Sequence, residues 1–199
     1  MSFFDRVKKV TVFLFNLFYK LKYIGFENVG TGSYLICCNH LKFFDPFLVT
    51  IPFPKPMHYM AKAELFKIPL VNTFIKKLGA FPVKRGKAHS AAIESAISLL
   101  ESGENVLIFP EGTRSKTGVP GSAKPGAALV AFRSNAKILP VAIKIQKPKF
   151  FSKPHITVSF GHPIENSELP IEKASSNSFK EASKYIMDRI CELFHKIEF

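Results

Sequence analysis

The sequence predicts an α/β fold in which helices flank a central sheet. Two features of the pattern predict it. Short apolar segments typical of buried strands recur along the chain, and segments with the length and periodicity of helices separate them. Such alternation is typical of a layered α/β domain. The 199 residues contain no internal repeat or low-complexity segment, so one main domain with a sizeable core is expected.

Residues 1–22 are expected to form a helix that lies in a membrane interface. The residues that share one face at helical spacing are Phe3, Val7, Val10, Leu14, Leu17 and Leu21, and lysines flank them. No small-residue cleavage site follows, which argues against a secretory signal. The ten residues of the apolar stretch from 10 to 19 would reach about 15 Å as a helix, whereas a hydrocarbon core is about 30 Å thick. A helix packed on the protein core is the alternative.

The next segments alternate as the fold class requires. The expected strands are Tyr34–Cys38, Met57–Ala61 and Ala80–Val83, and the expected helices are a short one beginning at Asp45 and a longer one over Pro69–Leu78. Asp45 followed by Pro46 suits a helix N-cap and first helical position. Three prolines within residues 51–56 keep that helix short, and Gly79 ends the longer one.

The second half of the chain continues the same alternation. Expected helices cover Ala88–Glu101, Gly126–Asn135 and, as an amphipathic final helix, Ser178–Ile197. Expected strands cover Asn105–Phe109, Ile138–Ile145 and Ile156–Phe160, and Lys147–Pro154 is expected to be a loop. Residues 23–199 therefore form the main domain, with residues 1–22 as a membrane-associating helix.

Charge and composition restrict the partners. The net charge is +13, and 21 residues are Phe while none is Trp. Such a field attracts anionic lipid surfaces, nucleic acids or acidic carrier proteins. The basic residues are spread along the chain and no nucleic-acid motif is present, which disfavours nucleic acid. Cys37 and Cys38 are adjacent in a strand and point to opposite faces, so no mutual disulfide is expected and a reducing cytosolic setting is favoured.

Residues 39–45, Asn-His-Leu-Lys-Phe-Phe-Asp, place a histidine after a strand and a carboxylate at the next helix start. The turn between them can bring Asp45 to one ring nitrogen of His40, so that the other nitrogen accepts a proton from a substrate hydroxyl. No serine or cysteine nucleophile stands beside this pair. A structural histidine bonded to a helix start is the alternative.

Residues 109–115, Phe-Pro-Glu-Gly-Thr-Arg-Ser, follow the expected strand that ends at Phe109. Ligand sites in open α/β sheets commonly lie at this edge. Gly112 permits an unusual turn, Arg114 offers a donor fork suited to a phosphate, and Glu111 can hold Arg114 or bond a glycerol hydroxyl. An ordinary polar turn with a surface ion pair is the alternative.

Together these segments resemble the glycerolipid acyltransferase family that includes the 1-acylglycerol-3-phosphate acyltransferases. The first block of that family is Asn-His-x4-Asp and its third is Phe-Pro-Glu-Gly-Thr-Arg-Ser, and both match in full. The second block is similar at Lys62, Glu64, Leu65, Gly79, Phe81, Val83 and Arg85-Gly86, and the fourth at Leu139-Pro140-Val141. The four blocks occur in family order within residues 34–145.

The resemblance implies a mixed sheet flanked by helices and a reaction. His40, oriented by Asp45, would take a proton from the 2-hydroxyl of 1-acylglycerol 3-phosphate (lysophosphatidic acid), which attacks an acyl thioester. The phosphate would be held by Arg114, Lys62 and Arg85, with Glu111, Gly112 and Thr113 beside it. The donor would be coenzyme A or acyl-carrier protein, and no metal or cofactor is implied. The family setting implies the cytoplasmic face of the cell membrane, with peripheral or monotopic attachment.

Two departures and two rival functions remain open. Lys84 stands where many relatives carry Asp, and Lys124-Pro125-Gly126 replaces a basic residue followed directly by Gly, which leaves no clear role for Lys124. One rival function is transfer to a different acceptor, such as glycerol 3-phosphate or another lysophospholipid. The other is a non-catalytic basic protein that binds an anionic membrane or nucleic acid.

Overall fold

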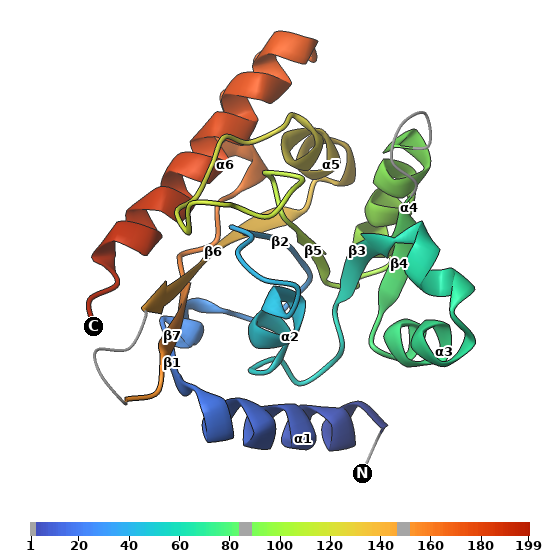
Figure 1. The fold of residues 1–199 in the computed structure, drawn as a ribbon. Helices are drawn as coiled ribbons and strands as arrows, with labels where there is room; N and C mark the ends of the chain where they lie inside the picture. The colour runs from blue at the N-terminus through green and yellow to red at the C-terminus, as the bar shows by residue number, and fades with distance from the viewer. Residues whose placement is uncertain (1–2, 84–88, 147–151) are drawn as a thin grey trace.

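A seven-stranded sheet forms the centre of the computed structural model, which describes residues 3–83, 89–146 and 152–199. The strand order is β1-β7-β6-β2-β5-β3-β4 (Figure 1). Strands β6, β2, β5, β3 and β4 are parallel, β7 runs antiparallel to β6, and β1 is parallel to β7. The sheet is therefore mixed, and the predicted α/β fold class is confirmed.

All strands except β1 occur close to where apolar runs predict them. They are β1 Lys20–Ile24, β2 Tyr34–Cys38, β3 His58–Lys62, β4 Ala80–Val83, β5 Val106–Ile108, β6 Lys137–Gln146 and β7 His155–Phe160. All five residues of β2 are buried, because this strand has neighbours on both edges and helices over both faces. Its side chains alternate between two apolar clusters, so Cys37 and Cys38 do point to opposite faces.

Helices cover both faces of the sheet. One layer holds α4 His89–Glu101, α5 Gly126–Ser134 and α6 Ser176–Lys196, and the other holds α1 Phe3–Phe18, α2 Asp45–Thr50 and α3 Pro69–Lys77. The described residues also form three short 3-10 helices in the connections: η1 Phe26–Asn28 before β2, η2 Ala63–Lys67 before α3 and η3 Asn166–Glu168 before α6. Figure 1 shows α6 along one side and α1 across the opposite end of the molecule. The helices predicted after residue 60 are confirmed to within two residues at each end, apart from the predicted start at Ala88, which lies outside the described residues.

The N-terminal helix differs from its prediction in length and in orientation. It ends at Phe18, because Lys20–Ile24 forms the unpredicted edge strand β1. Its inner side holds the buried Phe4 and the half-buried Val7, so Val7 is not on the exposed face as predicted. The solvent-facing stripe consists of Val10, Phe13, Leu14, Leu17 and Phe18. Within the described residues, no helix has both the length and the hydropathy needed to cross a bilayer.

The start of α2 also differs from the prediction. Asp45 is the first residue of the helix, and the N-cap residue before it is Phe44. The Asp45 carboxylate does not cap the helix that follows; its Oδ2 accepts hydrogen bonds from the turn that precedes it. Asp45 is fully buried by this arrangement, and Pro46 occupies the first turn.

Candidate active site

The two sequence motifs meet at one edge of the sheet. Strands β2 and β5 are adjacent and parallel, with Cys37 aligned to Ile108, so the segments that follow them leave the sheet together. Residues 39–45 continue from β2, and residues 109–115 continue from β5. The carboxyl ends of parallel strands are the usual place for a ligand site in such a sheet.

His40 and Asp45 are in direct contact. The His40 Nδ1 and Asp45 Oδ2 atoms lie 2.7 Å apart. The same oxygen accepts from the backbone N–H of Leu41 at 2.6 Å and of Lys42 at 2.7 Å. With Asp45 fixed in this way, the ring is held with Nδ1 toward the carboxylate, and Nε2 is the nitrogen that can act as a base. The His40 side chain is 19% exposed, so a ligand can reach it.

Asn39 fixes the backbone just before the histidine. Its side chain is fully buried and bridges to strand β6. The amide Nδ2 donates to the carbonyl of Ile143 at 2.9 Å, and Oδ1 accepts from the Ile143 N–H at 2.7 Å. Strand β2 ends at Cys38, and these side-chain bonds to Ile143 take the place of the backbone hydrogen bonds between β2 and β6. Asn39 thereby sets the direction in which the chain leaves the sheet toward His40.

Residues of the second motif contact His40 at three points. The His40 N–H donates to Glu111 Oε1 at 2.9 Å, and its carbonyl accepts from the Ser115 N–H at 2.7 Å. The imidazole stacks on the Phe109 ring, with the ring centroids 4.0 Å apart. Glu111 is buried, and that burial raises the pKa of its carboxyl group above the ordinary value.

A pocket of about 290 Å³ opens beside His40. Its polar lining includes Lys62 from the end of β3, Gly112 and Lys124. Its apolar lining is made by Met60, Ala61, Ile93, Leu107, Ile108, Phe109, Pro110, Ala127 and Val130. His40 therefore lines a largely apolar pocket together with two lysines.

The residues predicted from sequence to hold the substrate are distributed unequally around this pocket. Lys62 and Gly112 line it, and Gly112 has a φ of 68°, the left-handed conformation that favours glycine. Thr113 and Arg114 follow on the same loop with exposed side chains that do not line the pocket. Arg85 lies outside the described residues. Both Glu111 oxygens accept backbone N–H bonds, from His40 and Gly121.

Lys124 is a pocket residue to which sequence reasoning gave no role. Its backbone N–H donates to the Pro110 carbonyl at 2.9 Å, which draws the end of the loop back toward the site. Its side chain then crosses over Gly112, where a Cβ would lie 3.0 Å from the Lys124 Nζ. One feature of the sequence could have identified Lys124 as a site residue. It stands directly before Pro-Gly at an expected helix start, where free backbone N–H groups and positive charge are concentrated.

The buried thiols close to the site are poor nucleophiles. Cys37 and Cys38 are free and fully buried, and burial raises the pKa of each thiol above its ordinary value. At neutral pH they therefore stay protonated. His40 is therefore the candidate for the reactive group at this pocket.

Comparisons with known proteins agree on one family. The sequence model described as Acyltransferase matches residues 20–144. The chain is 32% identical over 176 residues to 1-acyl-sn-glycerol-3-phosphate acyltransferase of Bacillus subtilis (strain 168), covering 86% of this chain and 87% of that protein. It is 31% identical over 141 residues to the protein of the same name from Streptococcus pneumoniae, covering 69% of this chain and 52% of that protein.

A solved structure shares the fold. It is the crystal structure of the 1-acyl-sn-glycerophosphate (LPA) acyltransferase PlsC from Thermotoga maritima, which aligns with a TM-score of 0.70 at 22% sequence identity. The alignment covers 98% of this chain and 83% of that chain. The architecture of the mixed sheet and its helices is therefore common to both.

Proposed function

The chain belongs to the acyltransferase family, and on that premise we propose that it transfers a fatty acyl group from an acyl thioester to the 2-hydroxyl of lysophosphatidic acid. The product is phosphatidic acid, so the place of the enzyme is phospholipid synthesis. The observation that carries the proposal is the 2.7 Å contact between His40 and Asp45 at the mouth of an apolar pocket. The relatives that are named for this reaction support the choice of acceptor.

The chemistry needs one base that later acts as an acid. His40 Nε2 takes the proton of the acceptor hydroxyl while the oxygen of that hydroxyl attacks the thioester carbonyl carbon. When the tetrahedral intermediate collapses, the carbon–sulfur bond breaks and the leaving thiolate accepts the proton from His40. Asp45 stabilises the transient imidazolium and keeps the ring oriented. Positioned general acid–base catalysis of this kind contributes about 10²–10⁴ in rate.

Cationic groups around the pocket mouth are proposed to hold the acceptor phosphate. Lys62 and Lys124 line the rim, and Arg114 is on the same loop as Gly112. The guanidinium of Arg114 can bond two phosphate oxygens at once, whereas each lysine acts as a compact charge. Thr113 and Arg85 complete the proposed set.

The apolar wall of the pocket is proposed to receive an acyl chain. Met60, Ile93 and Val130 come from three different elements and enclose space next to the base. Each buried methylene contributes about 0.8 kcal/mol, so a chain of several carbons gains substantial binding there. The thioester is a co-substrate, carried by coenzyme A or by acyl-carrier protein, and no resident metal or cofactor enters the scheme. A net charge of +13 suits an acidic carrier.

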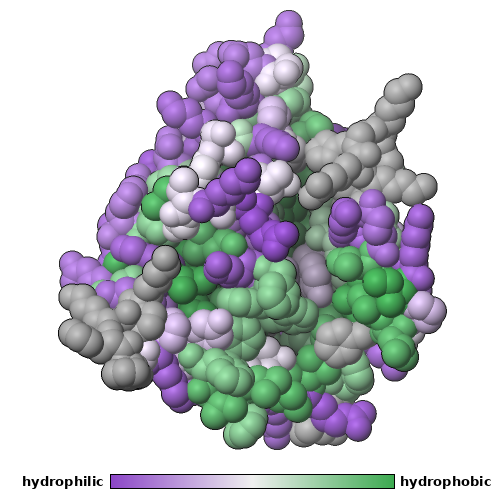
Figure 2. Space-filling model, viewed as in Figure 1, coloured by the Kyte–Doolittle hydropathy of each residue, from purple (hydrophilic) through white to green (hydrophobic). Residues whose placement is uncertain are grey.

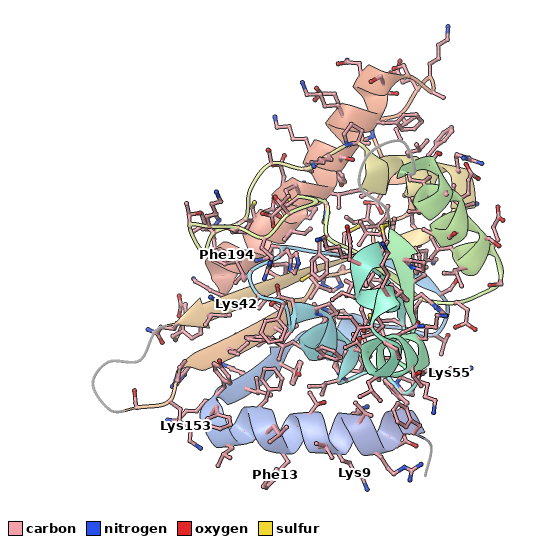
Figure 3. All side chains as sticks on the ribbon, turned by 45° about the vertical axis from the view of Figure 1, so that its right-hand side comes forward. Lys9, Phe13, Lys42, Lys55, Lys153 and Phe194 are labelled. Carbon is pink, nitrogen blue, oxygen red and sulfur yellow. The ribbon has the colours of Figure 1, made fainter. Side chains whose placement is uncertain are left out.

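Attachment to an anionic membrane at its cytoplasmic face, peripheral or monotopic, is proposed for the edge that carries α1 and α3. Helix α1 exposes the stripe of Val10, Phe13, Leu14, Leu17 and Phe18, and the η2–α3 segment exposes Ile68 and Leu70. Figure 2 shows hydrophobic surface over both elements. In Figure 3, Phe13 and Lys9 point from α1 away from the sheet. Apolar side chains beside lysines are typical of a helix lying in a lipid interface.

An assay of acyl-thioester consumption tests the proposal. Lysophosphatidic acid, glycerol 3-phosphate and a second lysophospholipid are supplied in turn, each with coenzyme A and with acyl-carrier protein as the donor. Consumption that depends on lysophosphatidic acid and is abolished by His40→Ala is the expected result. Dependence on a different acceptor would support the rival substrate, and no consumption with any pair would support a non-catalytic membrane protein.

A further inference from the structure

The backbone of His40 is clamped from both sides by the loop that follows β5. Its N–H is bonded to Glu111 and its carbonyl to the N–H of Ser115. Hydrogen bonds on both peptide groups of one residue restrict the φ and ψ of that residue, and these angles determine where the side chain points. The orientation of the imidazole therefore depends on this loop as well as on Asp45.

Glu111 connects His40 to the far end of the same loop. Its Oε1 accepts from the His40 N–H at 2.9 Å, and its Oε2 accepts from the Gly121 N–H at 3.1 Å. The residue is only 7% exposed, so water competes little for these bonds. Hydrogen bonds to an ionised acceptor are roughly twice as strong as neutral ones. One carboxylate thus joins His40 to both ends of a loop that lies some seventy residues further along the chain.

We propose that Glu111 is a positioning residue for the reaction, which acts through His40 and does not bind the acceptor. The proposal rests on the proposed role of His40 as the base. It replaces the expectation from sequence that Glu111 lies beside the phosphate. A displacement of about 1 Å at a reacting group can cost roughly 10²-fold in rate, so a loosened His40 backbone lowers turnover even when both substrates still bind.

Two variants perturb the clamp from opposite ends. In Glu111→Gln, one amide oxygen can still accept a bond, but the NH2 group faces the N–H of either His40 or Gly121. In Gly121→Ala, the new Cβ lies 3.0 Å from Glu111 Oε2 and displaces the carboxylate. Residue 121 itself does not line the pocket. Ser122→Ala is the matched control, because Ser122 is the exposed neighbour of Gly121.

The measurement is steady-state kinetics with both substrates varied, together with thermal unfolding of each variant. Glu111→Gln is expected to lower kcat by about 10- to 100-fold with both KM values within about twofold. Gly121→Ala should lower kcat by a smaller factor, again without a change in KM, and Ser122→Ala should change neither. A tenfold rise in the KM for lysophosphatidic acid at unchanged kcat would make Glu111 a ligand and overturn the proposal. Lower stability with normal kcat would also overturn it.

A second readout keeps the proposal separate from the proposed function. NMR signals of the His40 imidazole report its orientation in the full chain, whether or not lysophosphatidic acid is the acceptor. These signals should shift in Glu111→Gln and in Gly121→Ala and remain unchanged in Ser122→Ala. Identical imidazole spectra in all four proteins would reject the positioning role. Absence of any acceptor-dependent activity in the unmodified protein would instead reject the proposed function.

Discussion

One oxygen of the Asp45 carboxylate receives three hydrogen bonds, from the ring of His40 and from two backbone N–H groups. Asp45 is fully buried, and within the described residues its second oxygen has no hydrogen-bond partner. The negative charge is therefore stabilised by directed donors on one side only. A neutral residue of the same shape keeps the bonds but cannot stabilise an imidazolium to the same extent.

Asp45→Asn is accordingly expected to fold and to turn over far more slowly, by about 10²- to 10⁴-fold in kcat. Its amide NH2 would occupy the site of the unpartnered oxygen, and a buried donor without a partner costs about 1–3 kcal/mol in the free energy of unfolding. Kinetics and urea denaturation on the same sample check both effects. Turnover near that of the unmodified protein would remove Asp45 from the mechanism.

Arg114 is exposed on the loop that also carries the pocket residue Gly112, and it is proposed to bind the acceptor phosphate. Arg114→Lys keeps the charge and loses the planar fork, so the KM for lysophosphatidic acid should rise with little change in the KM for the thioester. Arg114→Ala should raise it further, by about 1.5–3 kcal/mol in binding free energy. A donor-only defect, seen with coenzyme A and absent with a donor that lacks the nucleotide, would move Arg114 to the donor site.

The Glu111 carboxyl makes folding pH-dependent. Burial raises its pKa, so the folded protein binds this proton more tightly than the unfolded chain does. The stability that the carboxyl contributes is complete below the ordinary pKa of an unfolded glutamate, and it is lost as the pH rises through the raised folded value. The free energy of unfolding of the unmodified protein relative to Glu111→Gln should therefore fall as the pH rises from the ordinary glutamate pKa of about 4 through the raised folded value. A difference that stays constant or rises over that range would contradict this.

At the scale of an element, helix α1 has two apolar sides, of which one packs against the protein and the other is exposed. The inner side packs on α2 and β3 around the small pocket that includes Phe4, Val7 and Phe47. Lys8 also reaches inward, and its Nζ donates to the Phe53 carbonyl at 2.8 Å. The outer side is largely exposed to solvent. Packing of the inner side determines which residues are exposed and available for the proposed lipid contact.

Phe13→Ser should weaken binding to anionic vesicles without unfolding the protein. Phe13 is 69% exposed, so its ring adds little to folding, and burial of such a ring in lipid contributes about 1.5–3 kcal/mol, or roughly 10- to 100-fold in partitioning. Phe132→Ser is the matched control, because Phe132 is an exposed phenylalanine on α5, in the opposite helix layer. Vesicle sedimentation measures the membrane binding of both variants. An equal loss of binding for the two would rule out an α1-specific contact.

At the scale of the whole molecule, apolar and electrostatic attachment respond differently to salt. Charge attraction is screened within about 8 Å at physiological ionic strength and about 3 Å at 1 M, while apolar burial is little affected. Deleting residues 1–18 should therefore release the protein more completely than 1 M salt does. This deletion spares strand β1, which a deletion through residue 22 would damage. Complete release by salt alone would mean that charge attraction, and not apolar contact by the helix, holds the protein on the membrane.

Local patterns in the sequence were enough for most of the fold and for the central pair of the site. Strand β2 is predictable because five successive buried positions give a continuous apolar run, and His40 and Asp45 are close in sequence. Strand β1 was missed because edge strands alternate polar and apolar residues and its partner β7 is more than a hundred residues away. The inward position of Glu111 and the crossing of Lys124 over Gly112 depend on loop geometry, which no periodicity encodes.

The β1–β7 pairing has a consequence for the order of events during synthesis. Lys20 aligns with His155, so β1 has no partner until the ribosome has made the residues of β7. At about 5–20 residues per second, helix α1 emerges several seconds before β7 does. During this interval α1 is free to meet a bilayer, while β2 and β5 can already pair and bring His40 to its loop. With the membrane contact proposed for α1, the nascent protein can reach a lipid surface first, assemble the proposed site second, and pair β1 with β7 last.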